Sequence, residues 1–487
     1  MDLVRRCLFV AAALSWAADS AHAQSSFGVG DLDPLGVLAG AQATRIAPDG
    51  SVVGLGILVG SNQTHAIVVG PGGVIALSPL PGDDGGVALD RNAAGDVVGT
   101  STDQVNIGPH VIQFEHPVLW TNGAPVDVRT LLQPGATSLD LRNAVSINAS
   151  GQILCLALDT TAFDGNHTLI VDGGFVTDIG SLAHPVHTET VGSRIDEFGR
   201  VVGYSFDPFG KQHAFLWDTT QMIDLHTTSL IQGSSSQAFD LNRFGYVAGS
   251  ADHQGGLFDK QTATIWNPSG SGLDLGTLGG DQSVAYAIND LGIACGFSYT
   301  TQGDPHAFLW KNGGMIDMNA LIDPLSGWVL VTARDIDEFG RVVGDGEYKG
   351  SARPFVALPQ CDGSYTVYGS ACPPPGSTAT PELRGWGCPS ASEPIAIEVS
   401  PLIAFVPGLL VVGTGSAATP MQSGCLLQTL PLTNLIVALP VSPPGGFYIP
   451  LTLPPVVPTV DLYVQTLFLY TPTNQLFSPK PIRIHLQ

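Results

Sequence analysis

Residues 281–318 read DQSVAYAINDLGIACGFSYTTQGDPHAFLWKNGGMIDM. Apolar residues alternate with polar or small ones in VAYAI (284–288), IACGF (293–297) and HAFLW (306–310), and Gly, Asn and Asp cluster between these runs. Period-two alternation bounded by turn-forming residues is typical of short antiparallel strands. Fragments of this stretch recur before and after it at nearly fixed spacing. The sequence therefore predicts an all-β repeat protein.

The repeats can be counted by the turn motif of the most regular hairpin. It reads as a small or polar residue, then Gly, then two apolar residues and usually a second Gly. Seven copies are present, with their first glycines at Gly50, Gly95, Gly151, Gly199, Gly245, Gly292 and Gly340. These glycines are 45 to 56 residues apart, which is the period of four-stranded propeller blades.

The two ends of the repeat array have complementary defects. The last copy stops after ARPFVAL (352–358) without a fourth strand, and FGVGDL (27–32) is a fourth-strand motif with no first three strands before it. Pairing these segments closes the ring and removes exposed sheet edges. We therefore predict a seven-bladed β-propeller over residues 24–358, in which the N-terminal strand completes the last blade.

Two further segments flank the propeller. Residues 1–23 combine Arg5 and Arg6, an apolar run from 7 to 18 and the small-residue sequence AHA, which predicts a secretory signal peptide. Residues 361–487 contain strand-like runs separated by prolines that prevent helix formation. They predict a small β-sandwich domain.

Composition limits the partners. The chain carries 19 Lys and Arg against 42 Asp and Glu, a formal net charge of −23, which argues against binding to nucleic acid or to an anionic membrane surface. The apolar run of the leader has about twelve residues, too few to span a membrane. We expect a secreted or cell-surface monomer without a cofactor, whose partner is an extracellular protein or polysaccharide.

A family resemblance follows from the pattern HAFLW…G…DLGTLGG…S.A..IN..G.VVG.S, which is repeated over roughly residues 27–358. It resembles the HAF repeat, named for His-Ala-Phe, of extracellular bacterial proteins. The segments VYGSACP (367–373), GWGCP (385–389) and GCLLQTLPL (424–432) resemble a C-terminal module common in exported planctomycete proteins. The resemblance implies secretion and a repeat scaffold, and it brings no catalytic residues.

Beyond Cys7 of the leader, the cysteines fall into two groups. Cys155 and Cys295 lie in blades three and six, which do not touch, so they are expected to be free and buried. The C-terminal domain holds Cys361, Cys372, Cys388 and Cys425. These four allow three connectivities, and we favour Cys361 with Cys372, and Cys388 with Cys425, because the first pair closes a short loop.

Motifs of known enzyme classes are absent from the sequence. It contains no HExxH, no P-loop, no CxxC and no GxSxG. His184 and His187 lack a third ligand at a matching spacing, so no metal site is expected. These observations favour a non-enzymatic binding scaffold that recognises a protein or polysaccharide. The alternatives are a propeller-type polysaccharide hydrolase or lyase, which needs blade-specific polar residues at one end of the channel, and a structural surface-layer or adhesion component.

Recurrent polar residues have a structural interpretation. Asp196-Glu197 and Asp337-Glu338 stand in turns where other copies have Asn, so they are expected to cap tight turns. One histidine recurs at the start of the third strand of five copies, so a structural hydrogen bond is favoured over catalysis. These histidines are His65, His116, His167, His213 and His306.

The longer and more variable connections mark the expected binding face. In an antiparallel four-stranded blade, the second-to-third and fourth-to-first connections emerge on the same face, and variable loops on a rigid scaffold carry binding residues. The candidate contacts on these loops are His184, His187, Asp207, Lys211, His253 and Asp281.

Overall fold

The computed structural model describes residues 27–486 with short gaps, and the expected leader lies outside the described residues. The gaps are 34–36, 62, 71, 108–109, 161–164, 184–188, 227–232, 255–258, 362, 373–381, 390–393, 401–407, 421–425, 440–446, 453–459 and 471–474. Within the described residues, regular structure consists of strands and two short 3₁₀ helices. The chain divides into two compact units, one of them Phe27–Leu358 and the other containing Pro359–Gln487.

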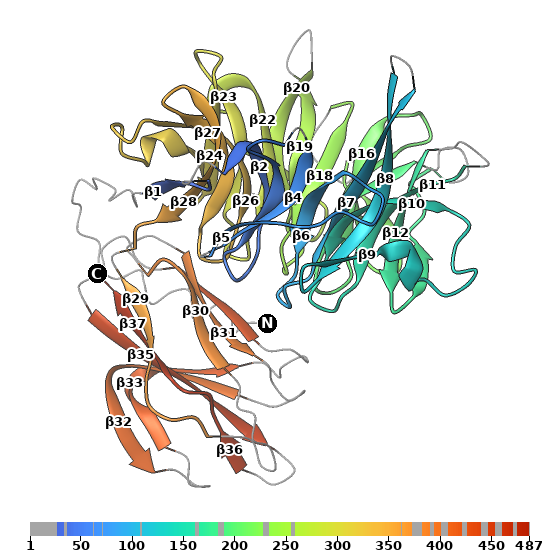
Figure 1. The fold of residues 1–487 in the computed structure, drawn as a ribbon. Coiled ribbons are helices and arrows are strands. Elements are labelled where there is room, and N and C mark those ends of the chain that lie inside the picture. Colours follow the sequence, from blue (N-terminus) through green and yellow to red (C-terminus); the bar gives the residue numbers. More distant parts are fainter. Residues whose placement is uncertain are drawn as a thin grey trace. The chain divides into compact units, whose positions relative to one another are not determined.

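The first unit contains seven four-stranded sheets among its described residues, numbered here as blades 1 to 7 (Figure 1). Blade 1 comprises β2 (Leu38–Ile46), β3 (Val52–Leu58), β4 (Thr64–Gly70) and β5 (Gly73–Ala76). Blade 2 comprises β6 (Gly85–Arg91), β7 (Val97–Ile107), β8 (His110–Thr121) and β9 (Ala124–Asp127), followed by the 3₁₀ helix η1 (Val128–Leu131). Blade 3 comprises β10 (Asp140–Ile147), β11 (Ile153–Leu158), β12 (Asn166–Asp172) and β13 (Phe175–Asp178). Blade 4 comprises β14 (Thr190–Ile195), β15 (Val201–Phe206), β16 (Gln212–Trp217) and β17 (Met222–Asp224).

The remaining blades follow the same plan. Blade 5 comprises β18 (Ser236–Leu241), β19 (Val247–Gln254), β20 (Asp259–Trp266) and β21 (Gly272–Asp274). Blade 6 comprises β22 (Gly279–Ile288), β23 (Ala294–Thr300), β24 (Pro305–Lys311) and β25 (Gly314–Asp317), followed by the 3₁₀ helix η2 (Met318–Ala320). Blade 7 comprises β26 (Trp328–Ile336), β27 (Val342–Tyr348), β28 (Ser351–Pro359) and β1 (Phe27–Asp31).

The first strands of the blades form a closed cycle. Each of them contacts the first strand of the next blade, and β26 of blade 7 contacts β2 of blade 1. These strands therefore surround the propeller axis, which is called the channel below. β1 is the fourth strand of blade 7, beside β28, so the two ends of the repeat array meet in one sheet. The predicted all-β propeller class is confirmed.

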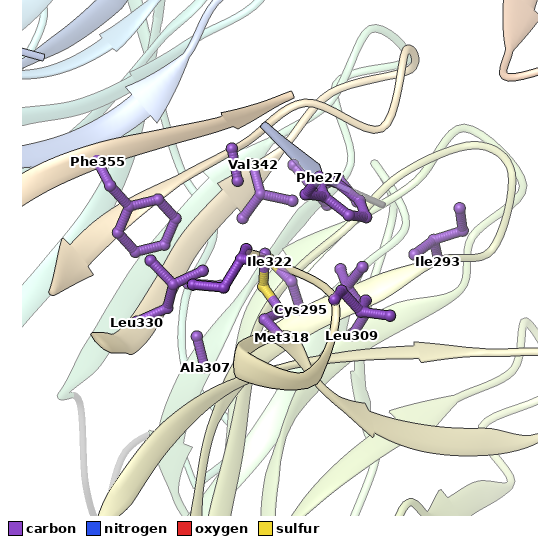
Figure 2. Close-up of a cluster of buried hydrophobic side chains, with 14 of the residues drawn as sticks. Phe27, Ile293, Cys295, Ala307, Leu309, Met318, Ile322, Leu330, Val342 and Phe355 are labelled. Atoms are coloured by element: carbon purple, nitrogen blue, oxygen red, sulfur yellow. The ribbon is translucent and has the colours of Figure 1, made fainter. Parts of the chain in front are cut away.

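Phe27 anchors β1 to the rest of the ring. Its side chain is 7% exposed and lies in a cluster with Leu309, Met318, Ile322 and Val342 from blades 6 and 7 and the segment between them (Figure 2). Its backbone N–H also donates to the carbonyl oxygen of Leu321 at 2.9 Å. The N-terminal strand is thus held by packing as well as by the sheet.

A β-bulge and the close approach of two strands explain the second glycine of the repeat. In all seven first strands the register with the second strand shifts just after a small residue, for example between Gly192 and Arg194. The second strand approaches closely at this point, and a Cβ on Gly203 or Gly296 would overlap the carbonyl oxygen of Val191 or Val284. Only Gly fits there without a shift of the backbone, except in blade 3, where Cys155 occupies the position.

The HAF motif fills the space between blades. Phe215 and Phe308 are fully buried, each in a cluster shared with the preceding blade. The serine of the following copy accepts the backbone N–H of the motif's second position, as from Ala214 to Ser236 Oγ at 2.9 Å. The residues of the motif therefore make the contacts between neighbouring blades. Each blade needs these contacts, which explains why the motif recurs.

The second unit contains two sheets among its described residues. The larger comprises β29 (Ser364–Val367), β32 (Gly408–Pro420), β33 (Leu426–Leu439), β35 (Val460–Tyr470), β36 (Gln475–Phe477) and β37 (Ile482–Leu486). The smaller comprises β30 (Glu382–Gly387), β31 (Pro394–Ser400) and β34 (Phe447–Thr452). Both sheets contribute to one hydrophobic core, with Ile397 from the smaller and Phe468 from the larger, each fully buried.

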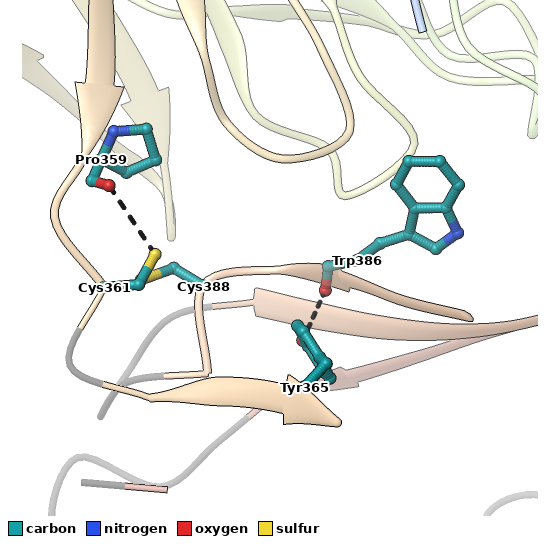
Figure 3. Close-up of a disulfide and its surroundings, with 5 residues drawn as sticks. All are labelled: Pro359, Cys361, Tyr365, Trp386 and Cys388. Carbon is teal, nitrogen blue, oxygen red and sulfur yellow. Dashed lines mark hydrogen bonds between the residues drawn. A yellow bond between two sulfur atoms is a disulfide. The ribbon is translucent and has the colours of Figure 1, made fainter. Parts of the chain in front are cut away.

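A disulfide joins Cys361 to Cys388, with 5.3 Å between their Cα atoms (Figure 3). The expected pairing of Cys361 with Cys372 and of Cys388 with Cys425 is therefore wrong. The Tyr365 hydroxyl donates to the Trp386 carbonyl at 2.8 Å, which brings the start of β29 beside the end of β30 and with it the two cysteines.

The other cysteines complete this picture. Cys372 exchanges backbone hydrogen bonds with Ser478 at 2.8 and 2.9 Å, which carries it to a different part of the unit, and it is also disulfide-bonded. Cys425 lies outside the described residues. Cys155 and Cys295 are free and buried, as predicted, and burial raises the pKa of both thiols.

Peptide mapping of the non-reduced protein is expected to find Cys361 linked to Cys388 and Cys372 linked to Cys425. The second pair follows because the two propeller thiols are buried and free, which leaves no other partner in the C-terminal unit. Closing the 27-residue loop between Cys361 and Cys388 stabilises the unit by about 3.5 kcal/mol in the loop-entropy estimate. A cross-linked peptide containing Cys155 or Cys295 would contradict this pattern.

Candidate functional site

One residue from each first strand reaches the centre of the propeller immediately after the bulge. We call these seven residues the channel ring. They are Arg45, Asp90, Ser146, Arg194, Asp240, Ala287 and Asp335. The position is equivalent in all blades, but the residue types differ. The ring combines three carboxylates with two guanidinium groups.

Ion pairs cross the channel between these residues. Nη1 of Arg45 lies 3.6 Å from Asp240 and 3.5 Å from Asp335. Arg194 lies 2.8 Å from Asp90 through Nη1 and 3.4 Å from Asp240 through Nε. Blades 1 and 5 are not neighbours, so the contact of Arg45 with Asp240 places these groups at the axis. The five charged groups form one connected network.

Backbone amides hold the second oxygen of each carboxylate. Oδ2 of Asp335 accepts the N–H of Ile46 at 2.9 Å, and Oδ2 of Asp240 accepts that of Ile288 at 3.0 Å. Oδ2 of Asp90 accepts from Ile147 at 3.0 Å and from the Ser146 hydroxyl at 2.6 Å. In each case the amide belongs to the next blade. The Oδ1 atoms are left facing the guanidinium groups, so each carboxylate has a fixed orientation.

The ring shifts the pKa values of two of its carboxyl groups in opposite directions. Burial, reinforced by the carboxylate of Asp240, raises the pKa of Asp335 to about 6. Burial acts on Asp90 in the same direction, but the charges of Arg194 and Arg45 with the hydrogen bonds from Ser146 and Ile147 outweigh it and lower the pKa of Asp90. Three carboxylates against two guanidinium groups leave one negative charge without a counter-charge, which explains why one carboxyl group retains its proton more readily.

The raised pKa of Asp335 predicts a pH-dependent stability. A carboxyl group that ionises at about 6 in the folded protein and at its ordinary 3.8 when unfolded favours folding fully below pH 3.8, and this contribution is lost as pH rises through 6. The loss is about 3 kcal/mol. Urea unfolding at pH 4 and pH 7 is expected to show a smaller decrease in stability for Asp335→Asn than for the wild type. Identical pH dependence in the two proteins would contradict the assignment.

The tight turns that follow the ring positions are tied together across blades. The Asn148 side chain donates to the carbonyl of Asp196 at 2.9 Å, and that of Asn289 donates to the carbonyl of Asp337 at 2.9 Å. Blade 4 has Asp196 at this position, and an aspartate cannot donate such a hydrogen bond. There the Arg200 side chain donates to the carbonyl of Asn242 in the next blade at 3.1 Å. These hydrogen bonds link the turns of neighbouring blades directly after the channel-ring residues.

Asp196 and Asp337 cap their turns, as the sequence predicts, whereas Glu197 and Glu338 accept an N–H of the preceding blade's turn, from Ala149 at 2.9 Å and from Asp290 at 3.0 Å. Oδ1 of Asp196 accepts the N–H groups of Phe198 and Arg200 at 3.0 and 2.8 Å. Oδ1 of Asp337 accepts the equivalent pair at 2.9 Å each. Nε of the Arg200 side chain also donates to Oδ2 of Asp196 at 2.7 Å. The two acidic residues are therefore part of the scaffold.

The repeated histidines make local hydrogen bonds. Nδ1 of His213, His306 and His167 lies 2.9, 2.8 and 3.1 Å from an aspartate eleven residues later. His116 pairs instead with Asp83 at 2.9 Å. His65 lies 3.3 Å from the Ser61 hydroxyl. Each histidine thus has a partner in its own blade or next to it, which agrees with the structural role expected for them.

The candidate contacts proposed from the loops have varied positions. His184 and His187 lie outside the described residues. His253 belongs to β19, where its backbone pairs with Lys260. Asp207 is 8% exposed and caps its own turn, because its carboxylate accepts the N–H groups of Phe209 and Lys211 at 2.8 Å each.

The last of these candidates are exposed. Lys211 lies at the surface in the same turn as Asp207. Asp281 is exposed in β22 and pairs with Lys260 of the preceding blade at 2.8 Å. The structure therefore brings Asp207 and Lys211 together in one turn, while Asp281 makes its ion pair on another blade.

Reasoning from motifs missed the channel ring because its residues share a position and not a residue type. The signal was available, since the ring residue stands two positions before the first residue of each tight turn. Aligning the seven turns places three Asp and two Arg in one column. Among the described residues, no group of three or more His, Cys, Asp or Glu side chains is arranged to hold a metal ion.

Comparison with known proteins gives matches in fold only. No protein-family model and no curated protein matches the chain. Solved structures that are similar include two complexes of Trypanosoma rangeli sialidase. One has 9% identity and a TM-score of 0.30 over 85% of this chain and 89% of the sialidase. The other, a covalent intermediate with 2,3-difluorosialic acid, has 8% identity and a TM-score of 0.31 over 95% and 91%. A Bombyx mori GH32 beta-fructofuranosidase has 8% identity and a TM-score of 0.23 over 95% and 90%.

The channel ring runs against the expectation of a non-enzymatic binding scaffold. It is a convergent cluster of acidic and basic side chains that the sequence motifs did not reveal. We therefore correct that expectation. At this level of identity the likeness concerns the fold, so the function is argued from the channel ring. In the part of the chain that the structure describes, no helix is long and apolar enough to cross a membrane.

Proposed function

We propose that the propeller is a polysaccharide hydrolase whose reactive groups are the carboxylates of the channel ring. The observation that carries this proposal is the convergence of Asp90, Asp240 and Asp335 from three blades on two guanidinium groups at the axis. Hydrolysis of a glycosidic bond generally needs one carboxyl group that is protonated and one that is ionised. The ring supplies both.

Asp335 acts as the general acid. Its pKa of about 6 keeps a proton available in mildly acidic solution, and a catalytic group is most effective when its pKa lies near the working pH. It donates the proton to the oxygen of the departing sugar as the bond from that oxygen to the anomeric carbon breaks. A water molecule then bonds to the anomeric carbon, and the proton that it releases restores the acid. Asp335 is oriented for this by the N–H of Ile46, which binds its other oxygen.

Asp90 remains ionised and faces the positive charge that develops on the sugar ring in the transition state. Arg194 keeps it ionised through the 2.8 Å ion pair. Asp240 contacts both Arg45, which pairs with Asp335, and Arg194, which pairs with Asp90. It therefore links Asp335 and Asp90 electrostatically through the two guanidinium groups. Pairs of carboxyl groups whose surroundings separate their pKa values are a recurring arrangement for acid and base catalysis.

We propose that the substrate approaches the ring along the propeller axis. The side chain of Arg194 is 28% exposed, whereas those of Asp90 and Asp335 are 3% and 7% exposed. A sugar therefore approaches the carboxylates past Arg194. The protein buries these two carboxylates and so keeps water away from them. With water excluded, their electrostatic interactions with the substrate are stronger.

We also propose that the repeats are of the HAF type and that the protein works outside the cytoplasm. The second part is supported by the disulfide between Cys361 and Cys388, because disulfides persist mainly in oxidising compartments. A purified protein that required reductant to keep its fold would contradict this location.

Release of new reducing ends from a panel of polysaccharides tests the proposed reaction. The wild-type protein is expected to release them from at least one neutral polysaccharide in mildly acidic solution, and Asp335→Asn is expected not to. Circular dichroism and thermal melting establish that both proteins are folded. If wild type and Asp335→Asn released equal amounts, the ring would be a structural clasp between blades and the proposal would be wrong.

A further inference from the structure

Three positions beside the channel ring carry aromatic residues in blades 4 to 6 and in no other blade. The first is the extra residue of the bulge in the first strand, and the others are one and three residues beyond the second-strand position where the glycine stands. We call the aromatic residues found there the aromatic wall. They are Tyr204, Phe206, Phe239, Tyr286, Phe297 and Tyr299.

The bulge position is aromatic only in blades 5 and 6. In the remaining blades, including blade 4, its residues are Thr44, Leu89, Val145, Ser193 and Arg334. The blade architecture therefore forms equally well with aliphatic or polar side chains there. Six aromatic residues gathered on three adjacent blades are not a requirement of the repeat, which indicates that they serve another purpose.

The rings of the aromatic wall form two groups in contact, one in blades 5 and 6 and one in blade 4. Phe239 of blade 5 lies 5.2 Å from Tyr286 of blade 6, and Tyr286 lies 6.0 Å from Phe297, as measured between ring centroids. Phe297 lies 5.8 Å from Tyr299, and in blade 4 Tyr204 lies 6.1 Å from Phe206. All six side chains are only half-buried. The wall therefore consists of a partly exposed aromatic surface shared by blades 5 and 6 and a second aromatic pair on blade 4.

The wall begins at the channel ring. Phe239 directly precedes Asp240, and Tyr286 directly precedes the ring position of blade 6. The guanidinium of Arg334 lies 5.5 Å from the Tyr286 ring and is paired with Asp345 at 2.9 Å. Its charge is therefore matched within blade 7, so it extends the surface without adding an unpaired positive charge.

We propose that the aromatic wall binds the sugar rings of a neutral polysaccharide and leads the chain to the channel ring. This inference rests on the proposed hydrolase function and specifies its substrate. The CH faces of pyranose rings pack well on aromatic faces, which offer large apolar contact areas of fixed geometry. Acidic glycans are disfavoured by the surplus carboxylate of the ring and by the net charge of −23.

Calorimetric titration of the full-length Asp335→Asn protein measures this binding without turnover. The probes are cellohexaose, xylohexaose, mannohexaose, maltohexaose and, as the acidic comparison, hexagalacturonate. Adding Tyr286→Ala or Phe297→Ala is expected to weaken binding of the preferred neutral hexasaccharide roughly tenfold. Val145→Ala and Leu156→Ala, the equivalent positions of blade 3, are the matched controls and are expected to leave the Kd within about twofold. Circular dichroism verifies the fold of each variant.

The outcomes separate this inference from the proposed reaction. If Tyr286→Ala and Phe297→Ala bind normally while hydrolysis still depends on Asp335, the aromatic wall is wrong and the hydrolase stands. If the wall variants lose binding but the wild type hydrolyses no polysaccharide, the wall stands and the hydrolase is wrong. Tighter binding of hexagalacturonate than of every neutral probe, or binding of no probe at all, overturns the inference.

Discussion

Deletion of residues 24–34 is expected to lower the melting temperature of the propeller by at least about 10 °C. The deletion removes β1, the fourth strand of blade 7, and with it the side chains of Phe27 and Leu32, which are 7% and 8% exposed. It also removes Asp33, whose carboxylate accepts the N–H groups of Val37 and Leu38 at 2.8 Å each. The edge of β28 becomes unpaired, which favours association between molecules.

Phe27→Ala isolates the packing contribution of this strand. Replacing a buried Phe by Ala typically costs about 3 to 5 kcal/mol, and Phe27 is packed among residues of blades 6 and 7 and the segment joining them. Leu325→Ala is the matched control, because Leu325 is 90% exposed and its loss is expected to change little. Calorimetric melting measures both variants. A deletion protein that melts at the wild-type temperature would show that β1 does not close the ring.

Asp335→Asn and Asp90→Asn are each expected to reduce hydrolysis by roughly 10² to 10⁴-fold. The first removes the proton donor, and the second removes the carboxylate that faces the developing positive charge. Asp178→Asn is the matched control, since Asp178 lies in the outer strand β13, where its carboxylate pairs with His167 and accepts the N–H of Gly180. It is expected to retain full activity.

The pH dependence of the reaction follows from the same residue. Asp335 donates only when protonated, so the wild-type rate is expected to fall about tenfold per pH unit above its pKa of about 6. Initial rates between pH 4.5 and 8.5 measure this limb. The residual rate of Asp335→Asn should not show it. A wild-type rate that rose steadily from pH 6 to pH 8 would remove Asp335 from the role of acid.

The fold could be read from the sequence because local and global signals agree in it. Alternating strands, glycine turns and the two incomplete ends all favour a closed propeller, and the structure explains why. The glycine at positions such as Gly203 faces a carbonyl of the neighbouring strand, and Phe215 fills the space between blades. Residues that every blade needs are repeated, so a single sequence reveals them.

The candidate site was hidden for the opposite reason. Residues such as Asp90, Arg194 and Asp335 serve a different purpose in each blade, and they appear as ordinary variation within the repeat. Only the bulge register, which places one residue of each first strand at the axis, shows that they meet. Their pKa values depend on burial and on the neighbouring charges at the axis, which the sequence alone does not reveal.

The disulfide was mispredicted because spacing along the chain is a poor guide to pairing. Cys361 and Cys372 are close in sequence, but β29 runs between them and carries the chain away. Cys388 stands directly after β30, whose end lies beside the start of β29 through the Tyr365 hydrogen bond. Sheet order decided the connectivity, and the sequence does not specify that order.

A crystal structure of Asp335→Asn with a bound neutral hexasaccharide tests the central claim most directly. We expect the sugar chain to enter the channel with its rings on Tyr286 and Phe297, one glycosidic oxygen within hydrogen-bond distance of residue 335, and the adjoining sugar ring facing Asp90. A hexasaccharide bound elsewhere on the molecule, with the ion pairs of Arg45 and Arg194 unchanged and no sugar in the channel, would contradict the assignment of the channel ring as the active site.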